Sequence, residues 1–169
     1  MIDQQFFLLI HNLAGKSRLL DFFGIFFADY LGYFLILFTL FFLWSIKDQR
    51  QRMRALFFLA LSLILSRGIL TELIRYFYHR SRPFSVLGFE PLIGEVNQGA
   101  FPSGHAAFYF ALAIAVYFLD QKKGKYLLAA AAVIGLARVF VGVHWPMDIV
   151  GGALAALFSV LAVKQILDK

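Results

Sequence analysis

The segment Phe101-Pro102-Ser103-Gly104-His105 combines residue types that can bind a phosphate and move a proton. A polar loop ends here and an apolar run begins at Ala106, so the serine is well placed to cap the start of a helix. A helix that starts at Ser103 would direct free backbone N–H groups and a positive dipole end at an anion above it. His105, in the first turn, could hold or release a proton near neutral pH. The alternative is a capped helix start with a histidine that takes no part in chemistry.

Two arginines form a second group, with the spacing Arg75-x6-Arg82-Pro83. Guanidinium groups bind phosphate oxygens bidentately. Proline ends a helix, so we expect one helix to run through both arginines and the chain to turn over the site at Pro83. Arg82 taken alone could equally be an ordinary arginine that flanks a membrane span. Arg75 would lie about 10 Å deeper in an apolar segment, where an unpaired charge is costly.

The third group is Arg138-x5-His144-x3-Asp148. The histidine and the aspartate are four residues apart, and they share one face if the turn between them is helical. Gly142 allows such a turn. An aspartate that accepts a hydrogen bond from one ring nitrogen leaves the other nitrogen available as a base or nucleophile. The alternative is an interfacial histidine next to an aspartate that only favours a helix dipole.

The composition indicates which solvent surrounds these groups. The chain has 169 residues, 61% of them hydrophobic, with 21 Phe and a mean hydropathy of +0.76. A soluble domain of this length cannot bury so much apolar surface, so much of it must face lipid. The net charge of +6 comes from short basic clusters between apolar runs, which is typical of membrane topology and not of a nucleic-acid surface. The absence of cysteine excludes disulfides and thiolate metal sites.

The hydropathy pattern predicts an all-α integral membrane helical bundle in a single domain, residues 1–169. About five transmembrane helices are expected, together with an N-terminal interfacial helix. The first dozen residues have an apolar face, but at about 1.5 Å per residue they cannot cross a bilayer core of roughly 30 Å. The predicted spans are residues 22–46, 55–79, 103–119, 126–142 and 146–167.

The basic clusters predict the topology. Residues 47–54 and 122–125 are rich in Lys and Arg and are expected on the inside. Five alternating crossings then place the 80–101 loop and the 142–146 turn together on the outside, so that all three groups meet at one membrane face. The apolar residues of the loop are expected to rest on the membrane surface.

Three charged residues fall at membrane depth: Asp29, Arg67 and Glu72. We expect them to face the bundle and pair, with the two acids as partners for Arg67 or Arg75 in a structural role. A zinc site built from the four histidines is not expected, because no second paired spacing is present.

Taken together, the three groups resemble the type 2 phosphatidic acid phosphatase superfamily, a family of metal-independent membrane phosphatases, over about residues 70–152. Arg75 stands where the family usually has lysine, and Ala137 where it usually has serine. The resemblance implies that His144 attacks phosphorus and is transiently phosphorylated, that Asp148 orients it, and that His105 protonates the leaving oxygen and then activates water. It implies no cofactor, and it assigns the binding of the phosphoryl oxygens to Arg75, Arg82, Ser103, Gly104 and Arg138.

Residues 12–15, 20–21 and 28–31 more loosely resemble the short bacterial undecaprenyl-diphosphate phosphatases. That resemblance implies a multi-pass protein of the bacterial cytoplasmic membrane with its active site on the extracytoplasmic side. Its partners would be a lipid phosphate substrate and membrane lipids, with no nucleic acid and no obligate protein partner. Phosphatidylglycerol phosphate, phosphatidate and lipid A phosphate remain alternative substrates. A non-catalytic anionic-lipid binder or transporter is the alternative from another class, and it would not need a His144–Asp148 pair.

Overall fold

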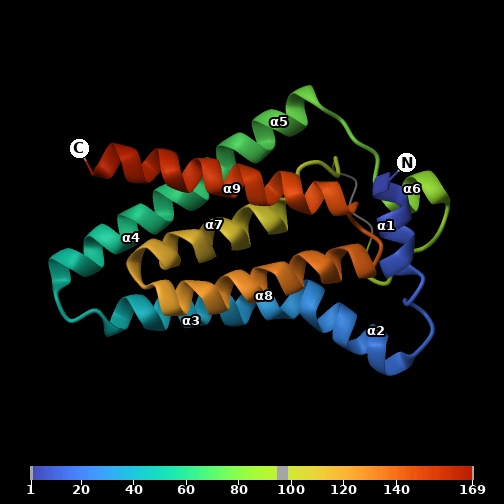
Figure 1. Ribbon diagram of the computed structural model, residues 1–169, viewed down its shortest axis with the longest axis horizontal. Coiled ribbons are helices and arrows are strands. Elements are labelled where there is room, and N and C mark those ends of the chain that lie inside the picture. Colours follow the sequence, from blue (N-terminus) through green and yellow to red (C-terminus); the bar gives the residue numbers. More distant parts are fainter. Residues whose placement is uncertain (1, 95–98, 169) are drawn as a thin grey trace.

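The computed structural model describes residues 2–94 and 99–168, and every regular element in these residues is a helix. A short helix, α1, crosses one end of a bundle of longer helices (Figure 1). The first long run consists of α2, a π-helical segment and α3, and the second consists of α4, another π-helical segment and α5. The bounds are α1 Ile2–His11, α2 Arg18–Ile25, π-helix Phe26–Tyr30, α3 Leu31–Ser45, α4 Gln49–Leu63, π-helix Ile64–Leu70, α5 Thr71–Phe77, α6 Pro83–Leu87, α7 Gly104–Leu119, α8 Gln121–Phe140 and α9 Pro146–Leu167.

The helices confirm the predicted all-α membrane bundle. Three runs are long and apolar enough to cross a bilayer, namely residues 18–45, 49–77 and 146–167. The shorter apolar helix α7 has 16 residues, and α8, with 20 residues, packs along it. The chain is therefore a multi-pass membrane protein.

Several predicted spans begin too late. The structure starts them at residues 18, 49 and 121, where the hydropathy pattern placed their starts at 22, 55 and 126. The additional first turns are polar, but Arg, Gln and Lys are good helix formers. Two of these turns are also capped: Asp48 accepts from the backbone N–H of Arg50 at 3.1 Å, and Asp120 accepts from that of Lys123 at 3.0 Å.

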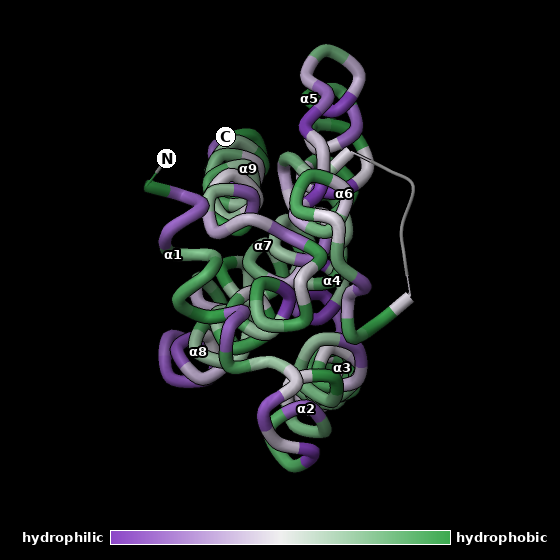
Figure 2. Tube along the Cα trace, turned by 90° about the vertical axis from the view of Figure 1, so that its right-hand side faces the viewer, coloured by the Kyte–Doolittle hydropathy of each residue, from purple (hydrophilic) through white to green (hydrophobic). Residues whose placement is uncertain are grey.

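The two ends of the bundle hold different segments of the chain. The starts of α4 and α8, which carry most of the two basic clusters, lie at one end together with the C-terminal part of α9 (Figure 1). The helix α1, the short helix α6 and the turn between α8 and α9 lie at the other end. Figure 2 looks onto this second end and shows mostly hydrophobic helices joined by more hydrophilic segments. The three predicted groups therefore meet at one end, opposite the basic clusters.

Close packing of small residues positions the start of α7. This helix packs against both α8 and α9. Its inward side is rich in buried alanines, and such small residues let membrane helices approach closely. A Cβ on Gly152 of α9 would lie 2.6 Å from the carbonyl oxygen of Ser103, so only glycine permits this contact. The buried alanines of α7 are Ala106, Ala107, Ala111, Ala113 and Ala115.

The loop that was expected to rest on the membrane instead packs largely on the protein. Phe84 is buried, and the backbone N–H of Leu92 donates to the carbonyl oxygen of Val141 at 3.0 Å. The ring of Phe89 packs on that of His11, with 4.4 Å between centroids. The apolar side chains of this loop find partners on α1 and on the α8–α9 turn, which hydropathy along the chain could not reveal. Residues 95–98 of the loop lie outside the described residues.

Candidate active site

A cavity of about 310 Å³ lies at the end of the bundle that holds the three groups. Its wall combines side chains from α3, the π-helical segment 64–70, α5, α7 and α8 with Arg82 and the α8–α9 turn. Six of the lining side chains are arginine or histidine: Arg67, Arg75, Arg82, His105, Arg138 and His144. The other lining residues are Ile36, Gly104, Phe108 and Tyr109. Four guanidinium groups around one small cavity form a strongly anion-binding site.

The guanidinium group of Arg75 contacts a backbone carbonyl oxygen and a carboxylate. Its Nε and Nη2 atoms donate to the carbonyl oxygen of Pro102 at 3.3 and 3.0 Å, and Nη1 lies 3.4 Å from Glu72. The Pro102 carbonyl directly precedes the start of α7. These hydrogen bonds therefore fix the position of the Arg75 guanidinium relative to the Ser103–His105 segment.

Arg82 reaches the cavity by a route that differs from the prediction. Helix α5 ends at Phe77, and residues 78–82 are not helical, so Arg75 and Arg82 do not share a helix; Pro83 instead begins α6. Nη1 of Arg82 donates to the carbonyl oxygen of Val143 at 2.8 Å. Burial, followed by the charges of Arg138 and Arg75, lowers the pKa of Arg82 to about 10. The guanidinium thus remains charged at neutral pH.

Arg138 pairs with a residue that was expected to pair elsewhere. Its Nη1 donates to Asp29 at 3.0 Å, whereas the sequence favoured Arg67 or Arg75 as the partner of that aspartate. Asp29 lies in the π-helical segment 26–30, where one extra residue per turn changes the direction of the side chains and where functional sites are frequent. Among the described residues, the buried Nε of Arg138 has no hydrogen-bond partner. A phosphoryl oxygen in the cavity would satisfy this N–H.

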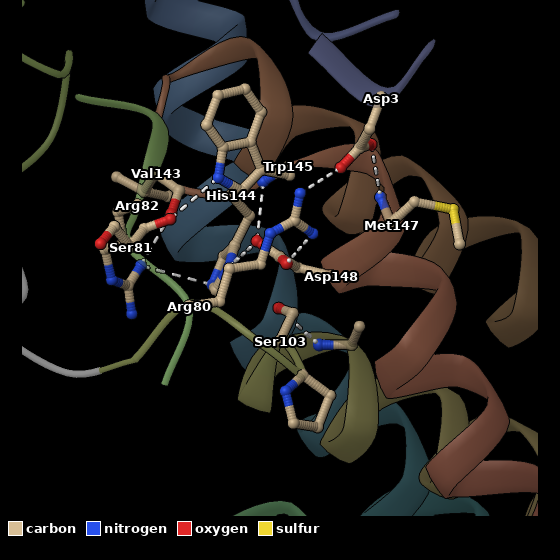
Figure 3. A network of polar contacts seen from close by, with 12 residues as sticks. Asp3, Arg80, Ser81, Arg82, Ser103, Val143, His144, Trp145, Met147 and Asp148 are labelled. Carbon is tan, nitrogen blue, oxygen red and sulfur yellow. Dashed lines mark hydrogen bonds and ion pairs between the residues drawn. The ribbon is translucent and has the colours of Figure 1, made fainter. Parts of the chain in front are cut away.

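His144 and Asp148 form the predicted pair, although the histidine precedes the helix. Gly142, at φ +91°, turns the chain after α8, and Asp148 lies in the first turn of α9. The Nδ1 atom of His144 lies 3.4 Å from Asp148 Oδ2, and Nε2 lies 3.5 Å from Nη1 of Arg82 (Figure 3). With a carboxylate at Nδ1 and an arginine donor near Nε2, the proton of the neutral ring belongs on Nδ1.

The surroundings of His144 keep it neutral. Burial, followed by the positive charges of Arg82, Arg138 and Arg75, holds the pKa of His144 well below its usual range. At neutral pH the ring is therefore unprotonated at Nε2, and this lone pair is available to attack an electrophile in the cavity.

The helix start at Ser103 is confirmed, but the Ser103 hydroxyl caps the helix and does not face the cavity. The Oγ atom accepts from the backbone N–H of Ala106 at 3.4 Å, and the side chain is fully buried and does not line the cavity. Gly104 and His105 do line it. A Cβ on Gly104 would come within 2.6 Å of Arg67 Nε, so a larger residue at this position would require the Arg67 side chain to shift.

Arg67 is a cavity residue that the sequence assigned to a structural role. It lies in the π-helical segment 64–70 and pairs with Glu72, which also contacts Arg75, as expected for one of the two acids. A charge at membrane depth is a signal for function in its own right. That signal could have placed Arg67 in the site.

In residues 2–94 and 99–168, no group of three or more His, Cys, Asp or Glu side chains could hold a metal ion. The cations of this cavity are guanidinium groups. Together with the N-terminus of α7 they can bind and neutralise a phosphoryl group while the neutral His144 faces it.

Comparison with known proteins identifies relatives that span nearly the whole chain. The protein named bacitracin transport permease protein BcrC, from Bacillus licheniformis, is 28% identical over 158 residues, which cover 93% of this chain and 76% of that protein. The undecaprenyl-diphosphatase BcrC of Bacillus subtilis is also 28% identical over 158 residues, covering 92% of this chain and 79% of that protein.

A solved structure matches the fold over nearly the whole chain. LpxE of Aquifex aeolicus superposes with a TM-score of 0.80 at 25% identity, covering 98% of this chain and 96% of that one. The sequence profile of the PAP2 superfamily matches residues 53–169, which include all three groups around the cavity. The chain therefore belongs to the PAP2 superfamily, the family of membrane lipid phosphatases that its three motifs resembled.

Proposed function

We propose that the protein removes the terminal phosphate of a lipid diphosphate, undecaprenyl diphosphate, through a phosphohistidine intermediate. The observation that carries this proposal is the neutral His144, paired with Asp148, in a cavity walled by four arginines. One of these arginines, Arg138, has a buried Nε–H without a hydrogen-bond acceptor among the described residues. A binder or transporter would need the arginines but has no use for an oriented, neutral histidine.

The proposed reaction has two displacements at phosphorus. Nε2 of His144 forms a bond to the terminal phosphorus while the bond from phosphorus to the bridging oxygen breaks, and His105, which the mechanism requires to be protonated in the complex with the anionic substrate, gives that oxygen a proton. His105, now neutral, takes a proton from water, whose oxygen attacks phosphorus while the bond from phosphorus to Nε2 of His144 breaks, so that inorganic phosphate leaves and His144 is regenerated. The proton on Nδ1 stays directed at Asp148, which stabilises the ring as charge develops on it. Arginines and the α7 N-terminus stabilise the phosphoryl oxygens.

A panel of purified lipids tests the substrate class. Phosphate release would be measured in detergent micelles from undecaprenyl diphosphate, phosphatidylglycerol phosphate, phosphatidate and lipid A. The proposal predicts the highest kcat/KM for the diphosphate. A higher value for one of the monophosphates would favour that substrate, and no release from any lipid would favour the binder or transporter.

We assign Arg67 to the second phosphate of a diphosphate, because it lines the cavity as a fourth arginine in addition to Arg75, Arg82 and Arg138. Replacing Arg67 by Gln is expected to lower kcat/KM for the lipid diphosphate by about tenfold or more, since a lost charge-assisted hydrogen bond is worth about 1.5–3 kcal/mol. Release from a lipid monophosphate should fall much less. Arg54→Gln, on the same helical run at the opposite end, is the control. Equal losses on both substrates would contradict a role for Arg67 in holding the second phosphate.

Catalysis is expected to need no divalent ion, because guanidinium groups occupy the position that metals have in other phosphatases. Phosphate release should survive excess EDTA and should be inhibited by vanadate, which mimics the five-coordinate transition state. The assay would compare chelated enzyme with enzyme supplemented with Mg²⁺ or Zn²⁺. Loss of activity in EDTA that one of these ions restores would overturn this expectation.

We also propose that the protein lies in the bacterial cytoplasmic membrane with the cavity on the extracytoplasmic side, because the basic clusters lie at the opposite end of the bundle. The chain has no cysteine, so single cysteines report cleanly on sidedness. Cysteines at the exposed positions Ser85 and Gly94 should react with a membrane-impermeant maleimide in intact cells, and one at Gln49 only after lysis. The reverse pattern would place the cavity in the cytoplasm.

A further inference from the structure

An arginine outside the cavity connects the N-terminal helix to the His144–Asp148 pair. Nη1 of Arg80 donates to Asp148 Oδ1 at 2.8 Å, and its Nη2 donates to Asp3 Oδ2 at 2.5 Å (Figure 3). The guanidinium also lies over the ring of Trp145, 5.4 Å from its centroid. Arg80 thus bridges α1 and α9 and is held on three sides.

Both oxygens of the Asp148 carboxylate have hydrogen-bond partners. Oδ2 accepts from the backbone N–H of Trp145 at 2.8 Å and lies 3.4 Å from His144 Nδ1, while Oδ1 is occupied by Arg80. A carboxylate held at one oxygen alone can rotate, whereas hydrogen bonds at both oxygens fix its plane. Since Asp148 is completely buried, that plane decides where the lone pair facing His144 points.

Asp3 holds α9 and Arg80 at the same time. Its Oδ1 accepts from the backbone N–H of Met147, in the first turn of α9, at 3.0 Å, and its Oδ2 accepts from Arg80. The first-turn N–H groups of a helix have no partner within the helix, so this contact satisfies one of them. Phe7, fully buried, fixes α1 in place by packing against Trp145 at 5.0 Å between ring centroids.

The geometry separates Arg80 from the phosphate-binding arginines. It does not line the cavity, and it lies between two carboxylates. Its charge is therefore directed at Asp3 and Asp148 and away from a substrate. Any effect of Arg80 on the reaction would have to pass through Asp148 and His144.

We propose that Asp3 and Arg80 are positioning residues: through them, α1 holds the Asp148 carboxylate in the orientation that directs Nε2 of His144 at phosphorus. The proposal rests on the proposed function, in which His144 is the nucleophile. It gives the N-terminal helix, whose outer side chains Ile2, Phe6 and Leu9 are exposed, a role beyond lying in the membrane interface.

The kinetic test uses Asp3→Asn, Asp3→Glu, Arg80→Gln and the double variant Asp3→Asn/Arg80→Gln, assayed for phosphate release from the lipid diphosphate. Misplacing a catalytic group by about 1 Å can cost about 100-fold, so Asp3→Asn is expected to lower kcat by about 10- to 100-fold, with KM within about twofold of wild type. Asp3→Glu, which keeps the charge, should recover part of the loss. The double variant should lose less activity than the product of the two single losses, because Asp3 acts partly through Arg80 and partly through its contact with Met147.

Asp21→Asn is the matched control, since Asp21 is another aspartate near the same end, and it accepts from a backbone N–H near it in sequence, that of Gly15, at 2.9 Å. It should retain wild-type kcat. Size-exclusion profiles and circular dichroism would check that each variant folds. If Arg80→Gln does not fold, Asp3→Asn alone still tests the proposal. Unchanged kcat in Asp3→Asn, a rise in KM alone, or additive losses in the double variant would each overturn the proposal.

A readout without turnover separates this inference from the proposed function. In ¹⁵N-histidine NMR spectra, with His144→Gln used for assignment, the wild-type His144 ring should show the Nδ1–H tautomer. Asp3→Asn should move it toward a mixture of tautomers, and Asp21→Asn should not. If the wild-type protein releases no phosphate but this shift occurs, the proposed function fails and the positioning contact stands. An active wild-type enzyme whose His144 signals are identical in Asp3→Asn would reject the positioning role alone.

Discussion

His144→Ala is expected to reduce phosphate release by about 10⁴- to 10⁶-fold, the scale on which enzymes lose activity with their nucleophile. The substitution removes the covalent route but leaves the arginines of the cavity and the N-terminus of α7 in place. Binding of the lipid diphosphate should therefore persist, within about tenfold of the wild-type Kd, because the phosphate contacts are made by other groups. Turnover and binding would be measured on the same purified protein in detergent.

His79→Ala is the matched control for this variant, because His79 is an exposed histidine at the same end of the bundle. It should retain wild-type turnover. Asp148→Asn should act in the same direction as His144→Ala but less severely, since it misorients the ring without removing it. Turnover close to wild type in a well-folded His144→Ala protein would contradict the phosphohistidine route.

His105→Ala is expected to have an effect that depends on the leaving group. The alkoxide that leaves a lipid monophosphate is a poor leaving group and needs a proton as the bond to phosphorus breaks, so release from a lipid monophosphate should fall by about 10²- to 10⁴-fold, the usual contribution of general acid catalysis. Nitrophenolate leaves readily without protonation. With nitrophenyl phosphate, formation of the phosphohistidine should therefore be affected far less than with the lipid.

The comparison is made in single-turnover experiments, which report the first displacement alone, because His105 is also the proposed base for the second. The burst of nitrophenolate should keep nearly its wild-type rate in His105→Ala, followed by slow hydrolysis of the phosphohistidine. An equal loss of the first step on both substrates would assign His105 to binding and not to proton transfer.

Local features of the site could be predicted from sequence, because they depend on neighbouring residues. Ser103 caps α7 through a backbone N–H only three residues away, and Gly142 provides the turn that brings His144 to the start of α9. The pairing of His144 with Asp148 also follows from their short separation. Hydropathy is equally local, and it correctly predicted an all-helical membrane bundle.

Features that depend on distant segments could not be predicted in the same way. The position of Arg82 depends on the carbonyl oxygen of Val143, 61 residues away, and so the helix through Arg75 ends early while Arg82 returns over the site. Asp29 meets Arg138 across 109 residues, from a π-helical segment that no sequence pattern indicated. The bridge from Asp3 to Asp148 likewise exists only once α1 has packed across the bundle.

The most direct test of the phosphohistidine mechanism is to trap the phosphoryl group on the protein. Lipid diphosphate labelled with ³²P in its terminal phosphate would be mixed with enzyme, and the reaction would be denatured within milliseconds in alkali, in which phosphohistidine is stable. Wild-type protein should carry label that peptide mapping assigns to His144 and that mild acid releases, and the label should accumulate in His105→Ala. Rapid release of labelled phosphate with no label on His144 at any time would show that water attacks the lipid phosphate directly and would contradict the mechanism.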